Sequence, residues 1–131
     1  MNGAYTDSRF AGLTNPNSGV NNSGKQPANV PRFSGNLWTS FRNLGGIPLE
    51  LGGGVRYIGK RFADEGNTLR LEQYALVNFY ASYHLTPHAL VTARVNNAFD
   101  KAYADWADIF YTSQVTLGEP RYFELSLVMK Y

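Results

Sequence analysis

The feature that most constrains this chain is an alternation of apolar and polar side chains that recurs along most of its length. Successive side chains of a β-strand point to opposite faces, so this period of two predicts strands with one apolar face. Its clearest instance is the closing segment 120–131, where large apolar residues take every second position: Phe123, Leu125, Leu127, Met129 and Tyr131. Such a face packs on a second layer in a soluble sheet, or contacts lipid in a transmembrane barrel.

Composition narrows the class of protein. Aromatic residues make up 15% of the chain, with nine Tyr and eight Phe, and cysteine is absent. No run approaches the roughly 20 consecutive apolar residues of a spanning helix, which excludes a helical membrane protein. The formal net charge of +2 is small and its basic residues are scattered, so nothing indicates nucleic acid as a partner.

Four other alternating segments precede the closing one, at 33–42, 49–59, 69–85 and 89–99, and residues 2–6 look like the end of a sixth strand. The connections alternate in length: long polar loops at 7–32, 60–68 and 100–118, and short turns at 43–48 and 86–88. Outer-membrane barrels have long extracellular loops and short periplasmic turns. This rhythm therefore favours an up-and-down transmembrane barrel over a soluble sheet.

Charge follows the same alternation. Every charge inside the five full strands falls on the face opposite the aliphatic residues: Arg42, Glu50, Arg56, Arg70, Glu72, Arg94, Glu124 and Lys130. An Arg or Lys facing lipid at mid-bilayer costs on the order of 2–4 kcal/mol, so the uncharged face suits lipid. We predict that Glu50, Arg56, Glu72, Arg94 and Glu124 form a solvated ladder on the lumen face.

These patterns predict an all-β fold, namely a segment of an antiparallel up-and-down transmembrane β-barrel with five full strands and part of a sixth. About six strands cannot close such a ring, and open edges in lipid leave backbone groups unsatisfied. We therefore expect an incomplete barrel, with the chain as a fragment of a larger protein. The first residues lack a charged leader with an apolar core, so an exported protein would begin upstream.

Several motifs add a family resemblance. Residues 96–103, Asn-Asn-Ala-Phe-Asp-Lys-Ala-Tyr, resemble a signature near the end of TonB-dependent outer-membrane receptors. Other stretches resemble that family in the same order: 29–32 before Leu37-Trp38, 54–59 with 62–64 and Asn67-Thr68, Tyr74 with Val77, and 118–121. The resemblance implies that residues 1–131 are the C-terminal part of a receptor barrel.

The same resemblance implies a function and partners. The parent protein would take up ferric siderophores or a similar scarce nutrient across the outer membrane of a Gram-negative bacterium. Its partners would be outer-membrane lipid, the barrel-assembly machinery and, through N-terminal regions absent from this chain, TonB. No cofactor is expected.

Loop side chains supply the candidate ligand contacts, since aromatic and polar groups on receptor loops are natural contacts. The candidates are Arg61, Asp64, Tyr103, Asp105, Trp106 and Tyr111. The competing interpretation is a solvated loop in which Arg61 and Asp64 form a weak surface pair. The closing residues Phe123, Leu125, Leu127, Met129 and Tyr131 resemble an assembly signal, and Tyr131 also suits an interfacial aromatic girdle.

Other chemistry finds little support. His84 and His88 flank a turn with no Cys or third His, so no metal site is predicted. Gly52-Gly53-Gly54 lacks the Lys and helix of a phosphate loop, and no catalytic arrangement is recognisable, so an enzyme is not expected. The alternative function is a non-transporting structural or adhesive module, either a small oligomerising barrel or a soluble carbohydrate-binding β-sandwich.

Overall fold

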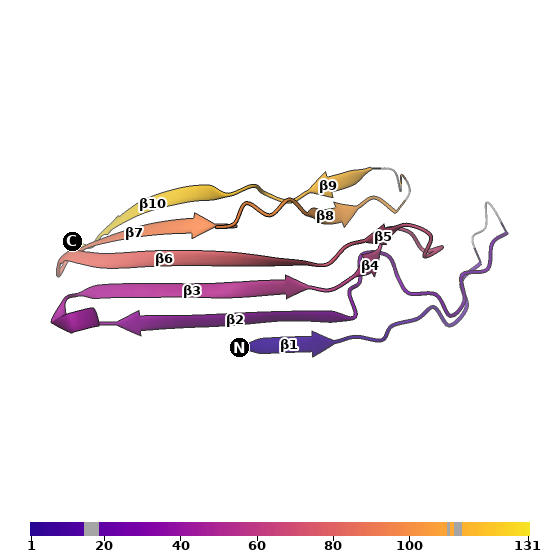
Figure 1. Cartoon of the computed structure of the whole chain (residues 1–131), viewed down its shortest axis with the longest axis horizontal. Coiled ribbons are helices and arrows are strands. Elements are labelled where there is room, and N and C mark those ends of the chain that lie inside the picture. Colours follow the sequence, from indigo (N-terminus) through magenta and orange to yellow (C-terminus); the bar gives the residue numbers. More distant parts are fainter. Residues whose placement is uncertain (15–18, 110, 112–113) are drawn as a thin grey trace.

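The computed structural model of the chain has one large antiparallel sheet, with the long connections gathered at one end of it (Figure 1). The structure describes residues 1–14, 19–109, 111 and 114–131. The sheet has six strands in the order β1-β2-β3-β6-β7-β10, with β1 and β10 as its two edges. They are β1 (Asn2–Tyr5), β2 (Phe33–Arg42), β3 (Leu49–Ile58), β6 (Tyr74–Thr86), β7 (Ala89–Asn96) and β10 (Tyr122–Met129). The predicted all-β, up-and-down, unclosed sheet is confirmed.

The register aligns the apolar residues of neighbouring strands into continuous rows. Leu51 in β3 is opposite Ala81 in β6, and the same row continues through Ala93 in β7 to Leu125 in β10. This apolar face carries no second layer within the described chain. Leu125 is 76% exposed. The large exposed apolar area is unlike a soluble sheet, whose apolar face would be buried.

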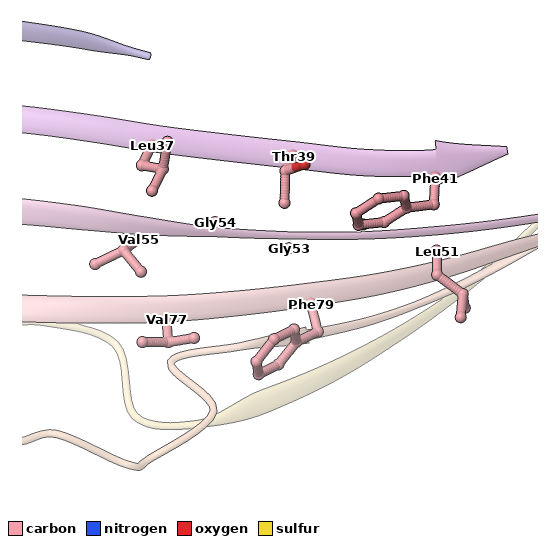
Figure 2. Close-up of a pocket in the computed structure, with 10 residues that line it drawn as sticks. Leu37, Thr39, Phe41, Leu51, Gly53, Gly54, Val55, Val77 and Phe79 are labelled. Atoms are coloured by element: carbon pink, nitrogen blue, oxygen red, sulfur yellow. The ribbon is translucent and has the colours of Figure 1, made fainter.

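A shallow depression of about 450 Å³ lies on the apolar face across β2, β3 and β6 (Figure 2). Its floor is Gly53, where a Cβ would lie 2.7 Å from Cδ1 of Phe79. Leu37, Thr39, Phe41, Leu51, Val55, Val77 and Phe79 surround it. Glycine at this position therefore makes room for a neighbouring aromatic ring.

Gly52 and Gly54 of β3 also make room for aromatic rings, on the polar face of the sheet. A Cβ on Gly52 would lie 2.1 Å from Cε1 of Tyr80, and a Cβ on Gly54 would lie 2.1 Å from Cε3 of Trp38. The two rings stack, with centroids 5.7 Å apart and planes inclined by 6°. The three glycines thus accommodate aromatic rings on both faces of one strand.

Tight turns join the strands at the opposite end of the sheet. The 3₁₀ turn η1 (Leu44–Gly46) connects β2 to β3, and Gly45 and Gly46 take positive φ angles of 63° and 81°. Residues 87 and 88 connect β6 to β7 next to a register shift between His84 and Thr86. No described helix has the length and apolar character needed to cross a membrane.

The loop end is more structured than the sequence suggested. Two small antiparallel pairs occur there: β4 (Arg61–Phe62) with β5 (Arg70–Leu71), and β8 (Ala104–Ala107) with β9 (Val115–Leu117). The segments predicted as loops at 60–68 and 100–118 therefore contain strand residues. We call the described residues within 7–32, 59–73 and 97–118 the head.

The long strand predicted over 69–85 is wrong at its start. Glu72 and Gln73 separate β5 from β6, which begins at Tyr74. A continuous strand would put Leu71 on the exposed apolar face with Ala75, whereas Leu71 is 5% exposed and packs in the head. The break before β6 therefore coincides with the burial of Leu71, which removes its apolar side chain from water.

Candidate ligand-facing site at the loop end of the sheet

The head has a small core of its own. Ala63, Leu71 and Ala107 come from three different parts of the chain and cluster together, and Ala104 packs against them. Ala63 and Ala107 are fully buried. Small side chains at these positions let the β4–β5 and β8–β9 pairs pack directly against each other.

Arg61 joins the two small pairs. Its side chain is buried, and its Nη2 donates to the carbonyl oxygens of Ala104 at 2.7 Å and Asp105 at 2.8 Å. Its guanidinium carbon lies 5.5 Å from the centroid of the Tyr74 ring, within the range of a cation–π contact. The predicted surface pair with Asp64 is wrong, because Arg61 turns inward and uses backbone carbonyls as its acceptors.

Asp64 holds its own loop in shape. Its carboxylate accepts hydrogen bonds from the backbone N–H groups of Thr68 at 2.9 Å and Leu69 at 2.8 Å, and from the Thr68 hydroxyl at 2.9 Å. Partial burial of the carboxyl acts to raise its pKa, but these hydrogen bonds to the charged form outweigh it and lower the pKa. Asp64 is therefore ionised at neutral pH and organises residues 64–69.

Tyr103 and Asp105 form an aromatic and acidic cluster with Tyr74. The Tyr103 and Tyr74 rings have centroids 4.3 Å apart, and the Tyr74 hydroxyl donates to Oδ1 of Asp105 at 3.3 Å. The Tyr103 ring lies over Gly118, whose absent Cβ would overlap it. Burial, with the nearby charge of Asp105, raises the pKa of Tyr103. Its hydroxyl therefore stays protonated at neutral pH.

Trp106 and Tyr111 are the two aromatic candidates whose side chains are exposed. Trp106 is 44% exposed and Tyr111 is 65% exposed. Both belong to the third loop, and Trp106 directly precedes the buried Ala107 in the chain. Their rings are thus available to solvent.

Asparagine side chains connect the loops. The sequence did not predict this role for them. Asn67 pairs with the backbone of Gln26: its Oδ1 accepts from the N–H at 2.8 Å, and its Nδ2 donates to the carbonyl at 2.7 Å. Asn29 pairs in the same two-bond manner with Ala107. Each side-chain amide offers one donor and one acceptor, as a backbone position in a strand does. The two pairs therefore connect the first long loop to the second and third long loops.

A third asparagine closes the base of the last loop. The Oδ1 of Asn97 accepts from the N–H of Lys101 at 2.9 Å, and its Nδ2 donates to the carbonyl of Glu119 at 3.0 Å. Asp100 adds a bond from the N–H of Arg121 at 2.8 Å. The motif at 96–103 therefore has a structural basis, since its polar residues join both ends of the loop.

Charged pairs line the polar face below the head. Nε of Arg42 lies 3.1 Å from Glu50, which also accepts a hydrogen bond from the Tyr80 hydroxyl, and Arg94 lies 3.3 Å from Glu124. Glu72, predicted for the same ladder, instead pairs with Lys60 in the head at 3.4 Å. The break before β6 moves Glu72 out of the sheet.

Known proteins are similar to this chain in sequence and in fold. Residues 1–98 match the family model described as TonB dependent receptor-like, beta-barrel. The chain belongs to the TonB-dependent receptor β-barrel family. The predicted family resemblance is thereby confirmed, and the unclosed sheet is a part of such a barrel.

Individual relatives agree with this assignment. The ferrioxamine receptor of Yersinia enterocolitica is 34% identical over 106 residues, covering 76% of this chain and 14% of the relative. The ferrichrome outer membrane transporter/phage receptor of Escherichia coli K12 is 30% identical over 105 residues, covering 76% of this chain and 13% of the relative. The chain thus spans about one seventh of the curated relatives it matches.

Solved structures extend the likeness to nearly the whole chain. The crystal structure of the siderophore receptor PiuA from Acinetobacter baumannii superposes with a TM-score of 0.80 at 28% identity, covering 97% of this chain and 18% of that structure. This coverage includes the head as well as the sheet. The likeness of this chain to a receptor structure is therefore not confined to the six-stranded sheet.

Proposed function

We propose that this chain forms the C-terminal part of the barrel wall of a TonB-dependent outer-membrane transporter that takes up ferric siderophores or a similar scarce nutrient. The observation that carries the proposal is its similarity, over 76% of the chain, to a receptor whose name specifies ferrioxamine. Relatives named for ferrichrome and ferripyoverdine support iron complexes as the ligand class.

The two faces of the sheet suit this role. The apolar face, which bears exposed residues such as Phe123 and Leu125, would contact the lipid of the outer membrane of a Gram-negative bacterium. The charged pairs would face the lumen. The barrel-assembly machinery would recognise the last strand through Phe123, Leu125, Leu127, Met129 and Tyr131. Contact with TonB would come from parts of the receptor outside these residues.

Within the head, the six candidate residues divide by the contacts that their side chains make. Trp106 and Tyr111 are exposed aromatic side chains on an anchored loop and would contact the ligand directly. Arg61, Asp64, Tyr103 and Asp105 would contribute to ligand binding by holding the loops in position, because each bonds to or packs on other parts of the head.

Uptake of labelled iron tests the function. Deletion of the gene should abolish import of ⁵⁵Fe supplied as one ferric hydroxamate or catecholate from a panel, in iron-limited cells. Complementation should restore it, and dissipation of the proton-motive force should abolish it again. Unchanged import of every complex after deletion would contradict the transporter role.

The ligand-contact assignment has a separate test. Trp106→Ala should reduce binding of the imported complex about tenfold or more, as for an exposed aromatic contact. Phe99→Ala is the matched control, since Phe99 is 76% exposed at the start of the same loop. Equal binding by both variants, at equal surface expression, would argue against direct contact by Trp106.

A further inference from the structure

A pocket in the head has an unusually basic lining. It has a volume of about 240 Å³. Its lining residues are Gln26, Arg32, Lys60, Arg61, Phe62 and Arg70. The pocket lies where the first long loop meets the β4–β5 pair, because Asn29 donates its backbone N–H to the carbonyl of Phe62 at 2.7 Å. Four positive side chains therefore surround one small space.

Two carboxylates at the pocket compensate this charge only in part. Asp7 lies 3.9 Å from Arg32, and Glu72 lies 3.4 Å from Lys60. The acidic side chains of both pairs are substantially exposed, where ion pairs are weak. The remaining two cations interact with neutral groups. Arg61 donates to carbonyl oxygens, and the Arg70 guanidinium carbon lies 5.8 Å from the centroid of the Phe62 ring.

Arg61 also carries an unsatisfied donor. Its Nη1 is buried and has no hydrogen-bond partner among the described residues, although the side chain is only 3% exposed. A buried charged donor without an acceptor leaves the positive charge of Arg61 incompletely compensated, which favours an anion nearby. The carboxylate of Asp105 does not serve as this acceptor. Its Oδ1 accepts a hydrogen bond from the Tyr74 hydroxyl, and Nη1 of Arg61 is left without a partner among the described residues.

We propose that this pocket binds an oxyanion group, a phosphate or a carboxylate, between Arg61, Arg70 and Lys60. Guanidinium groups present paired donors that match the oxygens of such groups, and Lys60 adds a point charge. Two sources carry this chemistry: the phosphates of an outer-membrane lipid, and a soluble anion, including an acidic ligand on its way into the barrel. The proposal goes beyond iron uptake and does not depend on it.

Inorganic pyrophosphate is a suitable probe. The protein, purified in detergent from outer membranes, would be unfolded thermally at increasing pyrophosphate and constant ionic strength. An anion that binds the folded state raises Tm in a concentration-dependent manner. We expect Arg70→Gln and Lys60→Gln each to weaken the apparent affinity about tenfold, as for loss of a charge-assisted hydrogen bond.

Lys101→Gln is the matched control, because it removes one positive charge from the head without altering the pocket lining. It should retain the wild-type affinity. The absence of a Tm rise beyond the chloride control in the wild-type protein would overturn the proposal. Equal weakening by Lys60→Gln and Lys101→Gln would also overturn it, and this comparison holds even if Arg70→Gln does not fold.

The same preparations distinguish the two sources. If lipid phosphate occupies the pocket, mass spectrometry should find more phosphorylated lipid retained by the wild type than by Lys60→Gln, and pyrophosphate should displace it. If the natural ligand is soluble, retained lipid should be equal in both while the difference in pyrophosphate affinity persists.

Discussion

The side-chain amide of Asn29 pairs with the backbone of Ala107, 78 residues further along the chain. Its Nδ2 donates to the Ala107 carbonyl at 2.8 Å, and its Oδ1 accepts from the Ala107 N–H at 3.0 Å. Ala107 is fully buried, so both bonds are shielded from water. This pair connects the first long loop to the third without a shared strand.

Asn29→Ala should loosen that connection, because two partly buried backbone groups lose their partners at about 1–3 kcal/mol each. Asn29 also has a φ of 60°, which asparagine tolerates better than alanine. Asn29→Gly keeps this backbone freedom and removes only the amide. Both variants should expose residues 100–118 to limited proteolysis, and Asn36→Ala, which affects a side-chain bond on the sheet, should not. Wild-type protection in Asn29→Gly would disprove the role of the amide.

Gly52→Ala should destabilise the sheet, because the new Cβ would lie 2.1 Å from the Tyr80 ring. The nearest atoms all belong to that flexible side chain. The double variant Gly52→Ala/Tyr80→Ala should therefore recover much of the loss in the urea midpoint of unfolding. Purely additive losses would show that the ring is not the obstacle.

Gly54→Ala should behave differently. Its Cβ would meet the Trp38 ring at 2.1 Å and also the backbone carbonyl of Leu37 at 2.7 Å, which cannot move aside. Trp38→Ala should therefore fail to rescue it in the same unfolding measurement. Gly3→Ala, with its nearest contact at 3.7 Å, is the control and should be nearly neutral.

Leu127→Arg and Val128→Arg compare the two faces at adjacent positions. Leu127 is opposite Val91 on the apolar face, and Val128 is opposite Leu90 on the other face. An arginine on a lipid-contacting face costs about 2–4 kcal/mol at mid-bilayer. Leu127→Arg should therefore impair membrane insertion far more than Val128→Arg, as judged by the amount of folded protein in outer membranes. Similar losses in both variants would refute the orientation of the sheet.

Acid should weaken the loop at 64–69. The folded-state pKa of Asp64 is lowered, so its stabilisation is complete above the ordinary value near 3.8 and is lost as pH falls through the folded pKa. Asp64→Asn should lower the urea midpoint at neutral pH, and the difference from wild type should shrink toward about pH 2. Glu65→Gln is the control in the same loop. A gap that is constant with pH would contradict the ionic role of Asp64.

The sheet could be predicted because its signal is local. Alternation fixes which side chains share a face, and a register that aligns Leu51, Ala81 and Ala93 follows once each strand is placed beside the next. The start of β6 could not be predicted in the same way. Leu71 fits the alternating pattern, but its burial with Ala63 and Ala107 depends on segments distant in sequence.

The head was less accessible to prediction for a similar reason. Arg61 and Asp64 were identified as ligand candidates from residue type alone, and their hydrogen-bond partners depend on the fold. Asn29 and Asn67 carried one usable signal, since asparagine tolerates positive φ better than most residues and both take it here. Their partners Ala107 and Gln26 contribute only backbone atoms, which leave no trace in residue identity.

The glycines of β3 also determine how far the polar face projects. The Trp38 and Tyr80 rings overlie Gly54 and Gly52 and are nearly parallel to each other, so the missing Cβ atoms let large side chains settle close to the backbone. A ring that lies flat against the sheet projects less far into the lumen than a ring that stands upright. In a closed barrel, this part of the wall would therefore leave more open space and present an aromatic surface. A molecule passing beside β3 would contact the faces of these rings.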